Sequence, residues 1–131
     1  MYLNMDSYRE VLLYLEESQK LGEVIPSPQL VNSVFERKTD IGTKEEIMYA
    51  IKQLCDADML EYINFLKDSN GVQHYKIKDI TPKGHEFLEN IKDESNWKKT
   101  KELAKKAGSF AIDVLGQISI NLLSEKIKGK I

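Results

Sequence analysis

The feature that most restricts the fold is a pair of β-prone runs inside an otherwise helical pattern. Residues 60–67 and 72–80 are rich in β-branched and aromatic side chains that alternate with polar ones. Asn70-Gly71 lies between them, and this dipeptide favours a tight hairpin because both residues tolerate positive φ. We therefore expect a two-stranded β-hairpin in the middle of the chain.

Apolar residues at helical spacing predict three helices ahead of this hairpin. Asp6 is a suitable N-cap for the first helix, and Ser27 for the second. The third helix begins at Thr43 and Glu46, which match a capping box because each side chain can bond the other's backbone N–H. The exposed side of this helix is then expected to consist of Glu45, Met48, Tyr49, Lys52 and Gln53.

Further helices follow the hairpin. Thr81-Pro82 predicts a helix start by cap and proline, Trp97 lies near the start of the next helix, and Gly108 ends or kinks that one. Three helices, a hairpin and a further helix are typical, in that order, of a winged helix-turn-helix. We expect a mainly α (α+β) chain with a two-stranded β wing and additional C-terminal helices, divided into a winged-helix domain over 1–93 and a helical tail over 94–131.

A family resemblance lies in the second half of the sequence. The segment from Ile80 to Leu88 reads Ile-Thr-Pro-Lys-Gly-His-Glu-Phe-Leu and is followed by Trp97-Lys-Lys-Thr-Lys101. It resembles the Leu-Thr-x-x-Gly-His-x-Phe-Leu and Trp-x-Lys-x-Lys signature of an uncharacterised family of small proteins from Gram-positive bacteria, their phages and prophages. The chain is also similar to the YjcQ-like proteins. The resemblance implies a winged-helix fold and a phage or mobile-element origin, and it implies no activity.

The charge of the chain is unevenly distributed. From Glu94 onward there are eight lysines and four acidic residues, a net charge of +4, whereas the preceding 11 basic and 17 acidic residues give −6. Phosphate contacts supply most of the sequence-independent affinity for DNA, and an acidic body repels phosphate. The charge pattern therefore argues against routine DNA binding by the winged-helix body alone.

A winged helix reads DNA with the exposed side of its third helix and with its wing. The predicted nucleic-acid contacts are polar residues on these two elements, with Gln53 suited to adenine: Lys44, Tyr49, Lys52, Gln53, Lys67 and Lys76. Glu45 and Glu46 interrupt this set, and the helix and wing contain no arginine. The same lysines are equally consistent with an ordinary solvated surface.

The last helix, expected over 109–128, carries apolar residues around more than half of its circumference. Such a helix needs a partner, and we expect a homodimer through one apolar side, which consists of Phe110, Val114, Leu115, Ile118 and Leu122. The alternative is that the helix folds back as a core helix. The lysines of this helix lie together near its C-terminal end and do not form a polar face along it. A helix bound at a membrane surface is therefore a weaker interpretation than a dimer contact.

No catalytic, cofactor or metal site is predicted. The two histidines and the single cysteine lack any nucleophile or metal-ligand spacing. We expect His74 to be exposed near the hairpin tip, His85 to pack partly buried against the wing, Trp97 to anchor the tail helix on the body, and Cys55 to be a buried core thiol. The thiol and the absence of a signal-like or membrane-spanning segment predict a cytoplasmic protein.

Two functions remain open at this point, and the sequence leads us to expect the first, with the second as the alternative. One is a dimeric DNA-binding transcriptional regulator, which base rates for bacterial winged helices favour. The other is an adaptor or inhibitor that binds a host protein and uses the winged helix only as a scaffold, which the acidic body favours.

Overall fold

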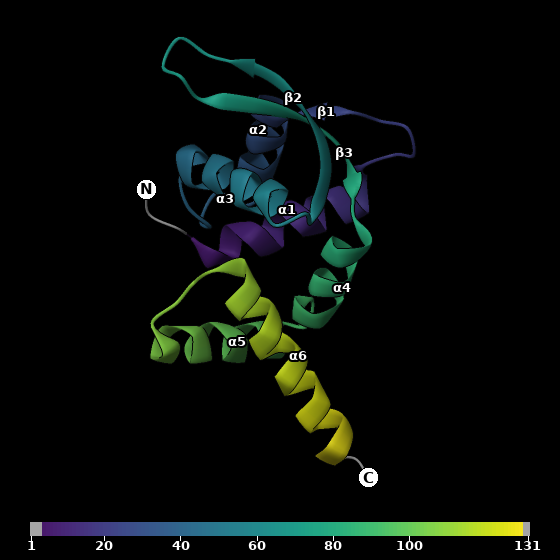
Figure 1. Cartoon of the computed structure of the whole chain (residues 1–131), viewed down its shortest axis with the longest axis vertical. Helices are drawn as coiled ribbons and strands as arrows, with labels where there is room; N and C mark the ends of the chain where they lie inside the picture. Colours follow the sequence, from purple (N-terminus) through teal and green to yellow (C-terminus); the bar gives the residue numbers. More distant parts are fainter. Residues whose placement is uncertain (1–3, 130–131) are drawn as a thin grey trace.

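The computed structural model describes residues 4–129, with side chains up to residue 127. Within this range the fold is α+β, with six helices and a three-stranded antiparallel sheet, and 63% of it is helical, which confirms the mainly α expectation (Figure 1). In chain order the elements are α1 (Met5–Ser18), β1 (Ile25–Pro26), α2 (Ser27–Arg37), α3 (Lys44–Asp56), β2 (Leu60–Lys67), β3 (Gln73–Ile80), α4 (Pro82–Ile91), α5 (Glu94–Ala107) and α6 (Ile112–Gly129).

The sheet has one strand more than the predicted two. Its order is β1-β3-β2, and the extra strand β1 pairs antiparallel with β3 through Ile25 opposite Ile77. Ser27 fixes this segment because its Oγ accepts a hydrogen bond of 2.9 Å from the backbone N–H of Tyr75. The hydroxyl is therefore used by the sheet, and the predicted N-cap role of Ser27 is wrong: Pro26 is at the cap of α2, without a side-chain hydrogen bond.

The hairpin β2–β3 confirms the predicted strands. Its turn differs in detail, because Gly71 has a positive φ of 80° and Asn70 does not. The backbone of Gly71 bonds the carbonyl of Asp68, and the Asp68 carboxylate accepts from the N–H groups of Asn70 and Val72. An aspartate that bonds the backbone ahead of it therefore closes this turn, together with one left-handed glycine.

Helix boundaries follow the predicted caps at most ends. Thr43 and Glu46 form the capping box of α3, Thr81 caps α4, and Gly108 ends α5 in the left-handed conformation with φ 73°. Besides Ser27, the exception is α1, whose N-cap is Asn4 and not the predicted Asp6. Asp6 is the second residue of this helix, where its carboxylate is free to contact other elements.

The hydrophobic core is one cluster that includes residues on both sides of the predicted domain boundary at residue 93. Trp97 and Ala104 of α5 and Ile112 and Leu115 of α6 belong to it together with the buried faces of α1, α3 and α4. Figure 1 shows the first half of α6 lying across α5 and near α4, while its second half extends away from the body. Among the described residues, no helix combines the length and apolarity needed to cross a membrane.

Gly84 permits the close approach of α4 to the segment that enters β2. A Cβ atom at this position would lie 2.2 Å from the backbone oxygen of Met59 and 2.7 Å from Cγ2 of Ile80. Thr81 strengthens the same junction, since its N–H bonds the Met59 carbonyl and its hydroxyl donates to the Asp58 carbonyl. The absence of a side chain at Gly84 therefore lets α4 pack closely against the entry to the hairpin.

Candidate binding face and a second, charged pocket

An open groove lies between the exposed side of α3 and the tip of the β2–β3 hairpin. It has a volume of about 590 Å³. Met48 and Tyr49 of α3 form one side, and Val72, which is 42% exposed, forms part of the other. The remaining lining residues are Glu45, Lys52, Lys67, Gly71 and Gln73. We call these eight residues the α3–hairpin groove.

The groove brings together three of the six predicted nucleic-acid contacts. Tyr49, Lys52 and Lys67 line it, with Tyr49 half-buried and both lysines exposed. Gln53 is half-buried and lines a different hollow beside Ala57 and Ala111, so it does not act with Tyr49 at one spot.

The other two predicted contacts lie against aromatic rings outside the groove. The Nζ of Lys44 is 5.3 Å from the centre of the Phe35 ring, and the Nζ of Lys76 is 4.7 Å from that of Phe65. Cations over aromatic faces are held by the ring quadrupole. These two lysines therefore flank the groove and do not line it.

The charges around the groove balance each other. The four lysines predicted as contacts, Lys44, Lys52, Lys67 and Lys76, are matched by four acidic residues on α3 and in the hairpin turn: Glu45, Glu46, Asp56 and Asp68. The ammonium of Lys52 lies 2.8 Å from the carboxylate of Asp56, and this hydrogen bond is the main reason why the pKa of Lys52 is raised. The lysine thus stays charged, but its charge is paired within α3. The face does not form a positive patch.

The two histidines are placed opposite to expectation. His74 is half-buried, and its Nε2 lies 3.1 Å from the Asp68 carboxylate, while its Nδ1 is buried without a partner in the described structure. Hydrogen bonds to Asp68, first from His74 and then from the Val72 backbone, hold the pKa of that carboxyl below its usual value. His85 is exposed, so the predicted packing of a half-buried ring on the wing is wrong. His74 instead supports the hairpin turn.

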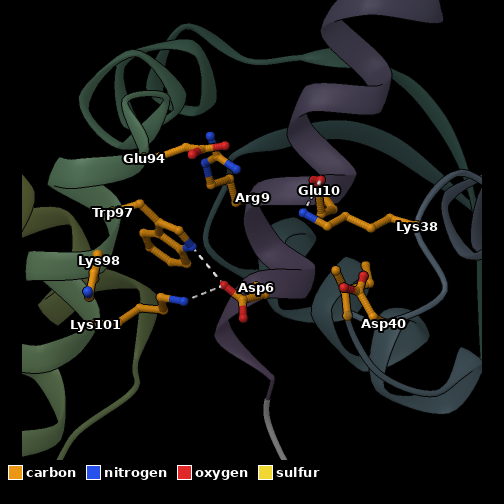
Figure 2. Close-up of a pocket in the computed structure, with 10 residues that line it drawn as sticks. Asp6, Arg9, Glu10, Lys38, Asp40, Glu94, Trp97, Lys98 and Lys101 are labelled. Carbon is orange, nitrogen blue, oxygen red and sulfur yellow. Dashed lines mark hydrogen bonds and ion pairs between the residues drawn. The ribbon is translucent and has the colours of Figure 1, made fainter.

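A second pocket, of about 450 Å³, lies between α1, the segment after α2 and α5 (Figure 2). Its central contact is the carboxylate of Asp6, whose Oδ1 accepts from the indole Nε1 of Trp97 and from the Nζ of Lys101, each at 2.8 Å. Arg9 donates to the backbone carbonyls of Ile91 and Lys92 at the end of α4. Trp97 is 4% exposed, which confirms its predicted role in anchoring α5 on the body.

Sequence reasoning missed this pocket because its residues come from segments far apart in the chain. The lining residues are Asp6, Arg9, Glu10, Lys38, Asp40, Ile41, Glu94, Trp97, Lys98 and Lys101. The sequence does indicate that Asp6 and Glu10 share one helical face and that Trp97 and Lys101 share another, because each pair is four residues apart. Nothing in the sequence indicates that the two faces oppose each other.

None of the five predicted dimer residues is fully exposed. Leu115 is completely buried in the core, and Phe110, Val114, Ile118 and Leu122 are half-buried. The exposed apolar residues of α6 lie on a different side, at Ile120, Leu123 and Ile127. Leu115 is therefore not accessible to a second chain in this fold.

One family model matches residues 2–110, and it is described as hypothetical protein (DUF2513). The match spans most of the chain, and the chain therefore belongs to the DUF2513 family, which is uncharacterised. Comparison with curated proteins and with solved structures gave no significant match in either case.

Proposed function

We propose that this chain is a non-catalytic, winged-helix-type binding protein whose α3–hairpin groove holds an apolar side chain of a protein partner. The observation that carries the proposal is the groove itself. It is open, has a volume within the range of ligand-binding pockets, and joins Met48 and Val72 to the half-buried Tyr49. Exposed apolar surface framed by polar groups is typical of protein–protein contact sites.

The element order supports the winged-helix interpretation. The elements follow the order α1-β1-α2-α3-β2-β3, which is a helix, a short strand, two helices and a hairpin. The second strand of the hairpin, β3, pairs with the short strand β1. Figure 1 shows the hairpin above α3 and α2, projecting from the same side of the body. In proteins of this class the third helix and the wing act together in binding.

Charge pairing favours a protein partner over DNA. A DNA-binding surface needs unpaired cations that can replace the counterions of phosphates. Here the lysines around the groove are equalled by acids, and Lys52 is held by Asp56. A protein segment with one large apolar side chain and flanking charges of both signs matches this surface better.

DNA binding remains the second candidate, and a specific observation favours it. Lys44 and Lys67 have no ion-pair partner among the described residues, and they lie on the two elements that contact DNA in winged helices. If the chain is such a regulator, its affinity for random duplex DNA falls steeply with rising salt.

Two measurements separate the candidates. Peptides selected from a displayed library on the wild-type chain should lose binding when Val72→Asp puts a charge in the groove, a change that the exposed position of Val72 tolerates. Fluorescence anisotropy with a random duplex at low salt should show no saturable binding. Steeply salt-dependent duplex binding that the double variant Lys44→Glu, Lys52→Glu abolishes would instead establish the DNA candidate.

For the assembly we propose a homodimer through the second half of α6, with a contact face revised by the structure. Ile120, Leu123 and Ile127 repeat at spacings of three and four residues and are 38–56% exposed. Such spacing forms an apolar stripe along one side of a helix. A phage or mobile-element origin and a cytoplasmic location stay part of the proposal; the free, buried thiol of Cys55 is consistent with the latter.

A further inference from the structure

The charged pocket contains more uncommitted acceptors than donors. Four basic and four acidic residues line it, and two of the four cations are already hydrogen-bonded, whereas three of the four carboxylates accept no hydrogen bond from the described residues. Arg9 donates to two backbone carbonyls, and Lys101 donates to Asp6. By contrast, the carboxylate of Asp40 and the second oxygen of Asp6 accept no hydrogen bond from the described residues.

Glu10 provides the strongest indication that the pocket holds a ligand. Its side chain is 9% exposed, and its Oε2 is buried and accepts no hydrogen bond within the described structure. The nearest cation, the Nζ of Lys38, lies 3.8 Å from the other oxygen, which is longer than a hydrogen bond. A buried carboxylate without donors is costly, so a donor that enters the pocket would be bound favourably.

The carboxylates are arranged around one space. Asp6 and Glu10 are four residues apart on α1 and so lie on the same face, and Asp40 approaches from the segment after α2 (Figure 2). Lys38 extends from that segment toward Glu10, and with about half of its side chain exposed it can move aside. No group of three acidic, histidine or cysteine side chains in the described residues is close enough to hold a metal ion. We therefore consider an organic cation in place of a metal ion.

We propose that this pocket binds a hydrogen-bonding organic cation of the guanidinium class. A planar guanidinium has five N–H donors in a fixed fork, which suits carboxylates that lack donors, as those of Glu10 and Asp40 do. The guanidinium is either a free small molecule or the side chain of an arginine. This inference does not depend on the α3–hairpin groove.

Trp97 gives a direct readout, since it is the one tryptophan of the chain and its indole N–H bonds Asp6. We would titrate the full-length protein with methylguanidine, at concentrations far below those that unfold it, and record Trp97 emission. N-methylurea, which has a similar shape and no charge, is the control ligand. A short capped peptide with one arginine, compared with the same peptide containing citrulline, tests the side-chain source.

The expected result is a saturable change in emission with methylguanidine or the arginine peptide and none with the two neutral controls. Glu10→Gln should weaken binding about tenfold or more, because it removes a charge-assisted hydrogen bond and keeps the shape. Asp40→Asn should weaken it several-fold, and this exposed position does not endanger folding. Glu125→Gln on α6, outside the pocket, should bind as the wild type does.

Equal responses to methylguanidine and N-methylurea, or no response to either cation, would overturn the proposal. So would unchanged affinity in both Glu10→Gln and Asp40→Asn, provided that circular dichroism shows both variants folded. If methylguanidine binds and the arginine peptide does not, the ligand is a free small molecule. The opposite result identifies an arginine side chain.

Discussion

The indole Nε1 of Trp97 donates a hydrogen bond of 2.8 Å to the carboxylate of Asp6, 91 residues earlier in the chain. The same oxygen accepts from Lys101 at 2.8 Å, so one acidic side chain at the start of α1 receives two donors from α5. Lys101 also lies 5.6 Å from the centre of the Trp97 ring. This cluster fastens the C-terminal helices to the body of the fold.

Replacing Trp97 with phenylalanine should therefore destabilise the protein. Trp97→Phe removes the hydrogen bond to a charged group, which contributes about 1–2 kcal/mol at a partly exposed site, and adds a packing loss because phenylalanine is smaller. Urea unfolding followed by circular dichroism measures the change. In a double-mutant cycle with Asp6→Asn the two effects should be less than additive, and strict additivity would show that the bond contributes nothing.

Asp6 should also make stability depend on pH. Burial alone would raise the pKa of its carboxyl, but the hydrogen bonds from Lys101 and Trp97 and the charge of Lys101 outweigh burial and lower it. The unfolded chain then binds a proton more readily, with a pKa of about 3.9. The stabilisation that ionised Asp6 gives the folded state is fully present above the pKa of the unfolded chain. It is lost as the pH falls through the lower pKa of the folded state. The loss of unfolding free energy in that range should be smaller in Asp6→Asn than in the wild type; equal losses would contradict the assignment.

The contact of α4 with the entry to β2 predicts opposite effects at two helical glycines. Gly84→Ala should cost about 2 kcal/mol or more, because the new methyl group meets the Met59 carbonyl and backbone must move. Gly116→Ala on α6 should instead be neutral or stabilise by about 0.5–1 kcal/mol, since alanine favours helix and its Cβ would lie 3.8 Å from Phe87. Thermal unfolding compares them, and similar melting temperatures would argue against the close approach.

The exposed stripe of α6 predicts the effect of a charge on assembly. Leu123→Asp should reduce the mass measured by light scattering from dimer to monomer, because it places a carboxylate in the proposed contact. Leu103→Asp on α5 is the matched control, since Leu103 is 40% exposed and Leu123 38%. A wild-type chain that is already monomeric, or a Leu123→Asp variant that stays dimeric, would exclude this face.

Local signals in the sequence located most of the helices and strands, because each depends on residues close together in the chain. Thr43 with Glu46, Thr81 with Pro82, and Gly108 each identify a helix end through a bond or a backbone angle formed within a few residues. The hairpin was found for the same reason. The predicted N-cap roles of Asp6 and Ser27 were wrong because each side chain bonds a partner far away in the sequence. The Ser27 hydroxyl accepts from the backbone of Tyr75, and the Asp6 carboxylate accepts from Trp97.

The third strand and both pockets lay beyond sequence reasoning for a different reason. Strand β1 has two residues and no periodicity of its own, and it exists because Ile25 lies opposite Ile77 in the assembled sheet. Three of the six predicted nucleic-acid contacts, Tyr49, Lys52 and Lys67, lie in one groove because α3 and the hairpin bring them together. Gln53 lines a different hollow, because the start of α6 lies beside it.

The proposed function requires that the α3–hairpin groove binds a protein segment through an apolar side chain. The most direct test is the affinity of a selected peptide, measured by titration calorimetry, for the wild type, Val72→Asp and the control Leu103→Asp. We expect the affinity to fall about tenfold or more in Val72→Asp alone, because a charge enters an apolar contact. Equal affinity for all three proteins would contradict it.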